Sequence, residues 1–249
     1  MTPASSGELA RDWAQHHGIH MDNLMTTDEP LAVLRRPNEH EQPKAVLSLD
    51  RDEVLHRTGG ACIAYYTGDV SWNERLTNRY DQAGIEGDGS IDASVRYVTN
   101  NDLALPVTDY LQVRDELHEL RAAGAYIVAT TAIITGCEQA VVRSLAQYYD
   151  GCFDGVIFSR GHLEVGSTKP RSLTRALGAV GIALQDMAVG HVDDSSRHVR
   201  GFLDNREQFG SVHLAMPICE GEPLDSELDI YRTDTTHEAI KRVREGMGI

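Results

Sequence analysis

The sequence predicts an α/β protein with three layers, in which a doubly wound parallel sheet is covered by helices on both faces. Short apolar runs alternate with segments of helical periodicity along most of the chain, in βαβα order. The apolar runs are nearly continuous, which is typical of parallel strands buried on both faces. The length of 249 residues suits one domain with a modest insertion. We therefore expect right-handed crossovers between the parallel strands.

The first 43 residues are polar and contain four of the eight prolines. One short helix is expected here, from Ser6 to His17. Because proline has no backbone N–H to donate, longer regular elements are not expected in this part of the chain. We expect residues 1–43 to form a loosely attached N-terminal extension, followed by a core domain that spans residues 44–249.

The core domain begins with the apolar run KAVLSL, residues 44–49, which predicts a buried strand that ends in the acidic turn DRDEVL. Residues from about 57 to 105 are rich in Gly, Asn and Asp and contain two strand-like pieces, ACIAYY and SVRYVT. They predict a small β-rich cap or insertion. Its aromatic residues either border the substrate or form a small core of the insertion itself; they are Tyr65, Tyr66, Trp72 and Tyr80.

After the insertion the alternation of helix and strand continues to the end of the chain. Helices are expected over about 106–124, 137–149, 171–183 and 235–246. Strands are expected over 125–132, 155–159, 186–192 and 211–217. This order predicts that the strands lie side by side in one sheet.

Composition and charge exclude several classes of protein. Acidic residues outnumber basic ones 38 to 23, and a net charge of -15 disfavours nucleic acid as a partner. No apolar run approaches the roughly 20 residues that a membrane helix needs, and the first 30 residues lack the pattern of a secretory signal. A cytoplasmic location is expected. The four cysteines show neither C-x-x-C pairs nor zinc-like spacing, which indicates free thiols.

Polar side chains follow four of the predicted strands. In a doubly wound sheet the carboxyl ends of the strands meet at one edge, and ligands bind there. These residues are Asp50 and Asp52, Thr130 and Thr131, Lys169 in the loop after 155–159, and Asp193 and Asp194.

The carboxylates of this set predict a divalent metal site. Carboxylates that converge on one cleft repel one another, and a cation is needed to hold them together. A set of oxygen ligands alone indicates Mg²⁺, which suits phosphoryl transfer; the ligands expected are Asp50, Asp52, Asp193 and Asp194. One Asp can then attack phosphorus as a nucleophile, and a carboxylate two residues on can protonate the leaving oxygen and afterwards activate water.

In this order the residues resemble the four motifs of the haloacid-dehalogenase-like (HAD) hydrolases. The first motif appears as LSLDRDEVL, the second as AYIVATTA, the third as STKPRSLTRAL and the fourth as MAVGHVDDSS. The resemblance spans about residues 44–217, and it implies the HAD-like Rossmannoid fold. The sequence Asp-Asp-Ser after a strand also resembles the small phosphatases of the carboxy-terminal-domain (FCP/SCP) type.

The resemblance implies a role for each matching residue. Asp50 is the implied nucleophile, and Asp52 is the implied general acid and base, with its main-chain carbonyl as a further metal ligand. Thr131 and Lys169 are the implied phosphate ligands. Either Asp193 or Asp194 is the implied metal carboxylate, and the acidic pair lies two positions further along than in many members, which carry Gly-Asp where this chain has Gly190 and His191.

The predicted function is that of a magnesium-dependent phosphatase that hydrolyses a phosphomonoester, a small phosphorylated metabolite, through an aspartyl-phosphate. One alternative is a phosphoprotein phosphatase of the FCP/SCP type, and another is a catalytically silent domain that binds metal or phosphate. Taken singly, each motif also has an ordinary structural explanation, since D-x-D is common in turns. His162 and His191 lie near the predicted cleft, although the mechanism requires neither of them.

Overall fold

The computed structural model describes residues 2–38, 42–132, 135–159, 168–222 and 230–249. In these parts of the chain, eight strands form one sheet in the order β1-β2-β5-β4-β3-β6-β7-β8. The six strands from β5 to β8 run parallel to one another, and β1 and β2 are antiparallel additions at one edge. The predicted α/β class with a mostly parallel sheet is confirmed.

Five of the parallel strands lie close to the predicted ranges. The N-terminal pair consists of β1 (Leu24–Asp28) and β2 (Leu31–Arg35). The parallel strands are β3 (Ala45–Leu49), β4 (Ala125–Thr131), β5 (Gly155–Phe158), β6 (Ala188–Val192), β7 (Ser211–Pro217) and β8 (Tyr231–Thr233). β1, β2 and β8 had no counterpart among the predicted strands.

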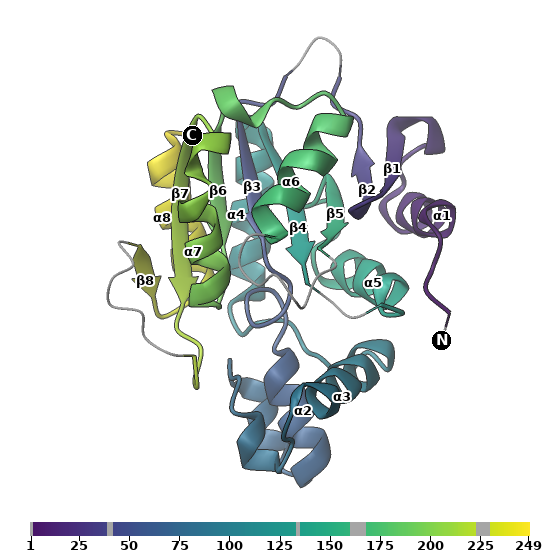
Figure 1. Cartoon of the computed structure of the whole chain (residues 1–249), viewed down its shortest axis with the longest axis vertical. Helices are drawn as coiled ribbons and strands as arrows, with labels where there is room; N and C mark the ends of the chain where they lie inside the picture. Colours follow the sequence, from purple (N-terminus) through teal and green to yellow (C-terminus); the bar gives the residue numbers. More distant parts are fainter. Residues whose placement is uncertain (1, 39–41, 133–134, 160–167, 223–229) are drawn as a thin grey trace.

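Helices cover both faces of the sheet. They are α1 (Ser6–His17), α2 (Thr58–Thr67), α3 (Asp88–Asn100), α4 (Tyr110–Ala123), α5 (Glu138–Tyr148), α6 (Thr168–Ala179), α7 (Ser196–Asp204) and α8 (Thr236–Met247). One core cluster packs α1, α4, α5 and α8 against one face, and a second packs α6 and α7 against the other. In Figure 1, α6 and α7 lie in front of the sheet. Successive residues of β3 alternate between the two clusters, with Leu47 in the first and Val46 in the second.

The prediction that residues 1–43 are loosely attached is wrong. β2 pairs with β5 and extends the sheet, and Trp13 of α1 is fully buried in the main core. α1 begins with a capping box in which Ser5 and Glu8 satisfy each other's backbone N–H groups. The prolines lie outside the strands, since Pro30 is in the turn between β1 and β2, and Pro37 and Pro43 lie between β2 and β3. The polar composition of this part of the chain therefore did not indicate the short apolar strand β2.

The prediction of a β-rich insertion is also wrong. The two strand-like pieces lie in helices α2 and α3, with the 3₁₀ turns η2 (Val70–Glu74) and η3 (Tyr80–Ala83) between them. β-branched and aromatic residues favour strands only as far as packing permits. Here Ala61, Cys62 and Val98 of the two helices pack with Ile85 and Ala104 in a small core, with Tyr80 against it, whereas Tyr65 and Tyr66 are exposed. This helical insertion is called the cap below.

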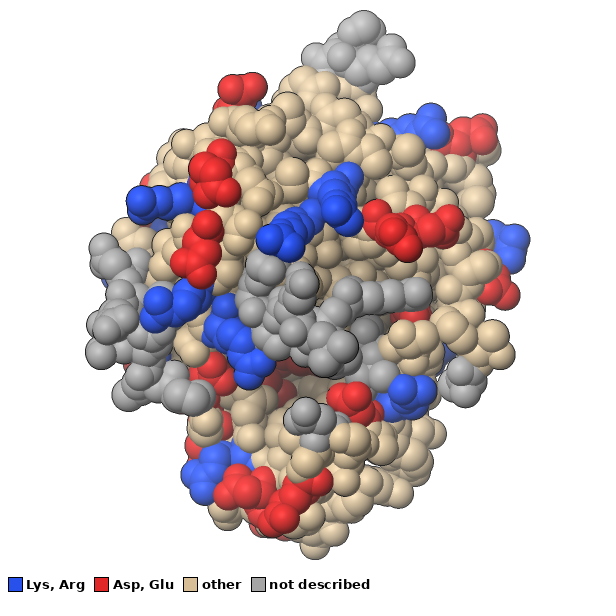
Figure 2. All heavy atoms as spheres, in the orientation of Figure 1, with Lys and Arg blue, Asp and Glu red and all other residues tan. Residues whose placement is uncertain are grey.

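The cap lies at the end of the molecule towards which β4, β5 and β7 point in Figure 1. The chain enters the cap from the carboxyl end of β3 and returns through α4, so the cap stands over the carboxyl ends of the parallel strands. On the face shown in Figure 2, acidic and basic side chains are interspersed over both the core domain and the cap.

None of the helices in the described part of the chain combines the length and the apolar composition that a bilayer-spanning segment requires. The four cysteines, Cys62, Cys137, Cys152 and Cys219, are buried and free.

Candidate active site

The site begins where two neighbouring strands of the sheet end. Leu49 of β3 is paired with Val192 of β6, and the backbone N–H of Asp50 donates to the carbonyl oxygen of Val192 at 2.9 Å. Asp50 and Asp193 therefore follow paired residues at the same edge. From β3 the chain continues to β4 on one side of it, whereas the later strand β6 lies on its other side. The direction of the strand order therefore changes at β3, and the carboxyl end of β3 is the switch point of the sheet.

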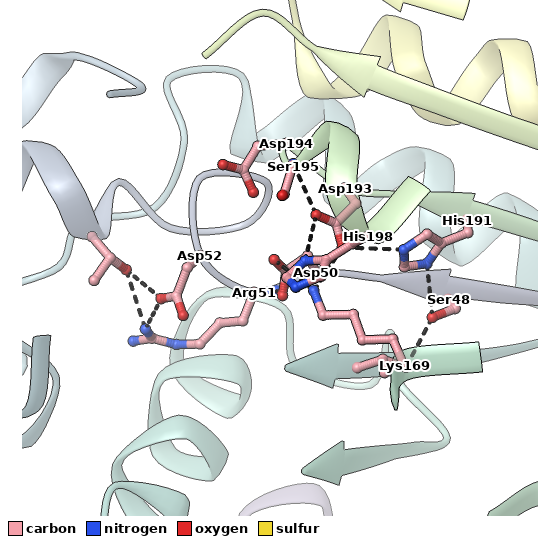
Figure 3. A network of polar contacts seen from close by, with 12 residues as sticks. Ser48, Asp50, Arg51, Asp52, Lys169, His191, Asp193, Asp194, Ser195 and His198 are labelled. Atoms are coloured by element: carbon pink, nitrogen blue, oxygen red, sulfur yellow. Dashed lines mark hydrogen bonds and ion pairs between the residues drawn. The ribbon is translucent and has the colours of Figure 1, made fainter. Parts of the chain in front are cut away.

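Lys169, in the first turn of α6, joins the two aspartates (Figure 3). Its Nζ lies 2.9 Å from Oδ2 of Asp50 and 2.6 Å from Oδ2 of Asp193. The lysine side chain is fully buried. Burial alone would lower the pKa of Lys169, but Asp193 and Asp50 together raise it above its usual value. The ammonium is therefore a permanent cation at the centre of the site.

Asp193 is held by donors on both of its oxygens. Oδ2 accepts from Lys169 and lies 3.1 Å from Nε2 of His191. Oδ1 accepts from the backbone N–H of Ser195 at 2.9 Å and lies 3.2 Å from Nδ1 of His198. Burial opposes ionisation of Asp193, but Lys169 and the two histidines hold its pKa well below the usual range. Asp193 is thus an ionised carboxylate whose lone pairs are already used by the protein.

The pKa values of Asp50 and Asp194 are raised, whereas that of Asp193 is lowered. Burial raises the pKa of Asp50 to about 7; Lys169 opposes this rise, whereas Asp193 adds to it. Burial, followed by repulsion from Asp193 and Asp50, raises the pKa of Asp194 well above its usual range. The amide of Asn78 donates to Oδ2 of Asp194 at 2.9 Å. These buried carboxylates lack sufficient positive charge, and a divalent cation is what such a set binds.

Geometry also identifies a cluster with the spacing of metal ligands. Among the described residues, ligand atoms of Asp50, Asp193 and His198 lie within 4.8 Å of one another. His198 was not among the predicted site residues. It lies in the first turn of α7, directly after the Asp-Asp-Ser sequence, and this position turns its side chain back towards the end of β6. A histidine one helical turn beyond an acidic strand end was the signal available in the sequence.

Asp52 points to a different set of partners. Its Oδ1 accepts from Nη1 of Arg51 at 2.6 Å and from the hydroxyl of Thr58, the first residue of α2. Arg51 is almost fully buried, whereas 29% of the Asp52 side chain is exposed. Sequence analysis did not assign a role to Arg51 or Thr58. Together they fix the orientation of Asp52 at the junction between the core domain and the cap.

The two threonines at the end of β4 differ in their partners. The hydroxyl of Ser48 donates to Oγ1 of Thr130 at 2.8 Å, and Ser48 is also 3.1 Å from Nδ1 of His191. Thr131 points to the other face of the sheet, because successive strand residues alternate. Its hydroxyl is buried and has no hydrogen-bond partner among the described residues. A buried hydroxyl without a partner is costly, and it indicates an absent ligand or water.

His191 lies inside the protein. Its ring stacks on Phe202 with centroids 3.9 Å apart, and burial lowers its pKa. It therefore acts as a neutral link between Ser48 and Asp193. His162, the other histidine considered from the sequence, lies outside the described residues.

The structure thus brings Asp50, Lys169 and Asp193 into direct contact. Asp194 follows Asp193 at the same strand end, and Thr131 ends the neighbouring strand β4. Asp52 belongs to the same loop, but its contacts are with Arg51 and Thr58.

No protein-family model and no curated protein matches the sequence. Solved structures resemble its fold. Protein tyrosine kinase A of Mycobacterium tuberculosis has a TM-score of 0.54 at 14% identity, with 84% of this chain and 100% of that one covered. A predicted phosphoglycolate phosphatase from Haemophilus somnus has a TM-score of 0.53 at 15% identity, with 80% and 97% covered. A haloacid dehalogenase-like family hydrolase from Xanthomonas campestris has a TM-score of 0.50 at 12% identity, with 84% and 98% covered.

These similarities confirm the HAD-like fold that the four motifs predicted. The names of the similar structures include a kinase as well as a phosphatase. A shared fold does not determine the reaction, so the function has to be argued from the site.

Proposed function

We propose that this chain, which has the HAD-like fold, is a magnesium-dependent phosphatase that hydrolyses a phosphomonoester through an aspartyl-phosphate on Asp50. The observation that carries the proposal is the contact of Lys169 with both Asp50 and Asp193 at the switch point of the sheet. A fixed buried cation beside a carboxylate is the arrangement that brings a phosphate dianion and an anionic nucleophile together.

Asp50 is the proposed nucleophile. A carboxylate oxygen of Asp50 attacks phosphorus, a new P–O bond forms, and the bond from phosphorus to the leaving oxygen breaks. Asp52 donates a proton to that leaving oxygen. In the second half of the reaction a water molecule attacks the same phosphorus and gives a proton to Asp52; phosphate leaves and Asp50 is restored. The two halves together consume one water and produce an alcohol and phosphate.

The role of Asp52 requires a change of partner. In the structure its Oδ1 accepts from Arg51 and Thr58, so a substrate has to displace these donors before the carboxyl group of Asp52 can reach the leaving oxygen.

Two side chains are proposed as ligands of the phosphate oxygens. Lys169 supplies a positive charge that is already oriented by two carboxylates. Thr131 supplies a hydroxyl that has no partner in the part of the chain that the structure describes. Thr130 is less suited to this role because its oxygen already accepts from Ser48.

The residues present fit a divalent metal ion. We propose Asp50, Asp194 and the main-chain carbonyl of Asp52 as its protein ligands; Asp193 belongs to the same acidic set but has its oxygens occupied by Lys169, Ser195 and two histidines. A set made of oxygen atoms alone favours Mg²⁺. When bound, the ion supplies positive charge for the carboxylates and for the phosphate.

A small phosphorylated metabolite is the proposed substrate class. The cap contacts the site directly, since Asn78 reaches Asp194 and Thr58 reaches Asp52. A site covered in this way favours a compact substrate over a phosphate on the surface of a folded protein, which is the substrate of the alternative phosphoprotein phosphatase.

The test is turnover of p-nitrophenyl phosphate by the purified protein with Mg²⁺ and with excess chelator, followed by a screen of phosphorylated metabolites and phosphopeptides. Turnover that requires Mg²⁺ supports a phosphatase. Metal binding without turnover of any phosphate ester would favour the catalytically silent binding domain. Preference for phosphopeptides would favour the phosphoprotein phosphatase.

A further inference from the structure

One segment of the cap is docked on the catalytic end of the core domain. This segment, Leu76–Arg79, connects η2 to η3 and is called the latch here. It forms a short parallel bridge with the loop after β7. The backbone N–H of Asn78 donates to the carbonyl oxygen of Glu220 at 2.8 Å, and that of Glu220 donates to Leu76 at 2.9 Å. The hydroxyl of Thr77 also donates to the carbonyl oxygen of Glu220, at 3.2 Å.

The latch is also held by the loop that carries the proposed nucleophile. Oε2 of Glu53 accepts from the backbone N–H of Thr77 at 2.9 Å, and Oε1 accepts from the backbone N–H of Gly59 in α2. Glu53 is only 2% exposed and has a φ of 57°. A residue with a long side chain rarely adopts this backbone conformation. The carboxylate of Glu53 thus joins the catalytic loop, the first turn of α2 and the latch.

Two glycines make the close approach possible. A Cβ atom at Gly59 would overlap the carbonyl oxygen of Thr77, and one at Gly60 would overlap the carbonyl oxygen of Trp72. Any other residue at these positions would push the segment that leads into the latch away from α2. The Thr-Gly-Gly sequence that opens α2 therefore has a packing role in seating the latch.

The side chain of the latch residue Asn78 reaches the catalytic centre itself. Its Nδ2 donates to Oδ2 of Asp194 at 2.9 Å, which joins the cap to the residues that follow β6. A neutral amide orients a carboxylate without cancelling its charge, so the negative charge of Asp194 stays available to a cation. The negative charge of Asp193, by contrast, is already balanced by the ammonium of Lys169.

We propose that Asn78 is a positioning residue that orients Asp194 for metal binding, so that the metal site is complete only while the latch is docked. The inference rests on the proposed function in taking Asp194 as a metal ligand. Docking of the latch and binding of the metal ion are then thermodynamically coupled. A bound metal ion stabilises the docked latch, and the docked latch strengthens metal binding by the same factor.

The experiment measures binding of Mn²⁺ alone, without substrate, to the metal-free protein by electron paramagnetic resonance. Asn78→Ala and the bulkier Asn78→Leu both remove the donor, and we expect each to weaken Mn²⁺ binding about ten-fold, the size of one hydrogen bond to a charged group. Gln82→Ala is the matched control, because Gln82 is an exposed amide of the same cap that bonds to Asp81. It should bind Mn²⁺ like the wild type.

Hydrogen exchange supplies a second readout that a merely structural asparagine would not change. Mn²⁺ should slow exchange of the backbone amides of Thr77, Asn78 and Glu220 in the wild type and in Gln82→Ala, and should do so much less in the Asn78 variants. Circular dichroism checks that each variant is folded, and the two differently sized substitutions guard against a packing defect in one of them.

Three results would overturn the inference. Both Asn78 variants could bind Mn²⁺ with wild-type affinity, Mn²⁺ could leave the exchange rates of the latch amides unchanged in the wild type, or the wild type could bind no Mn²⁺. The phosphatase proposal fails separately. If the protein binds Mn²⁺ in the expected Asn78-dependent way but turns over no phosphate ester, the proposed reaction is wrong, whereas the proposed role of Asn78 is supported.

Discussion

The ammonium of Lys169 lies 2.6 Å from a carboxylate oxygen of Asp193, although the two residues are 24 positions apart and both side chains are fully buried. Such a pair is stable only when every charge has partners, because desolvation of an unpaired charge costs several kcal/mol. The second carboxylate on this lysine is Asp50. Five predictions follow from this site and from the fold that holds it.

Replacement of Asp50 by Asn should reduce phosphatase turnover by several orders of magnitude, because the amide has the same shape but cannot attack phosphorus. Initial rates with p-nitrophenyl phosphate at saturating Mg²⁺ measure the loss. The exposed Asp150→Asn variant is the control and should keep full activity. If Asp50→Asn retains more than about a tenth of wild-type turnover, the nucleophile is another group.

Removal of metal by a chelator should stop turnover, and Mg²⁺ should restore it better than Ca²⁺. Calcium takes more ligands in a looser arrangement, which misplaces the nucleophile relative to phosphorus. Metal analysis of the purified protein and rates in defined metal buffers provide the measurement. Full activity in excess chelator, or stoichiometric zinc in the purified protein, would contradict the proposed Mg²⁺ site.

Thr131→Val and Thr130→Val should have opposite effects. Within the described ranges the buried hydroxyl of Thr131 has no hydrogen-bond partner. Its loss should therefore leave stability unchanged or raise it by about 1 kcal/mol, while kcat/KM falls about ten- to a hundred-fold. Thr130→Val removes the acceptor of Ser48 and should cost about 1–2 kcal/mol of stability. Denaturant unfolding and kinetics on both variants are the test. If only Thr130→Val loses activity, Thr130 is the phosphate ligand.

The metal-free protein should lose stability as the pH rises from 7 to 8. Burial raises the pKa of Asp50 to about 7 and that of Glu53 to about 8, so the folded state holds protons that the unfolded state has already released. Stability from these groups is complete at low pH and is lost as the pH passes through the folded-state pKa values.

The expected loss is on the order of 1 kcal/mol, which corresponds to a fall in Tm of about 2–4 °C. Thermal melts in chelator at pH 7 and pH 8 measure it. Glu53→Gln should flatten the dependence, whereas the exposed Asp150→Asn should leave it as in the wild type. A wild-type Tm that rises over this range would show that other groups control the stability.

Trp13→Ala should destabilise the whole protein by about 3–5 kcal/mol, since it empties a fully buried site in the main core. Met21→Ala, in the same N-terminal part but 45% exposed at the residue, should change stability by less than about 0.5 kcal/mol. Chemical denaturation of both variants provides the comparison. Equal, small effects would mean that α1 and the β1–β2 pair do not belong to the cooperative unit.

The cap shows why local sequence misled the prediction of its structure. ACIAYY and SVRYVT contain the residue types that favour strands, but they form helices that bury Ala61, Cys62 and Val98 against each other. The same limit applies to His198 and Asn78. Each acquires its place from packing between segments far apart in the chain, which periodicity does not encode.

The sequence by itself determined where five of the parallel strands lie along the chain and which polar residues follow them. Continuous apolar runs identify buried parallel strands, and the residue after each run has to lie at the carboxyl edge of the sheet, so Asp50, Thr131 and Asp193 were accessible to local reasoning. Only the tertiary structure decided which carboxylate binds Lys169 and which is oriented by Asn78. Adjacent aspartates look alike in a sequence, and they differ only in the buried charges and donors that folding brings to each.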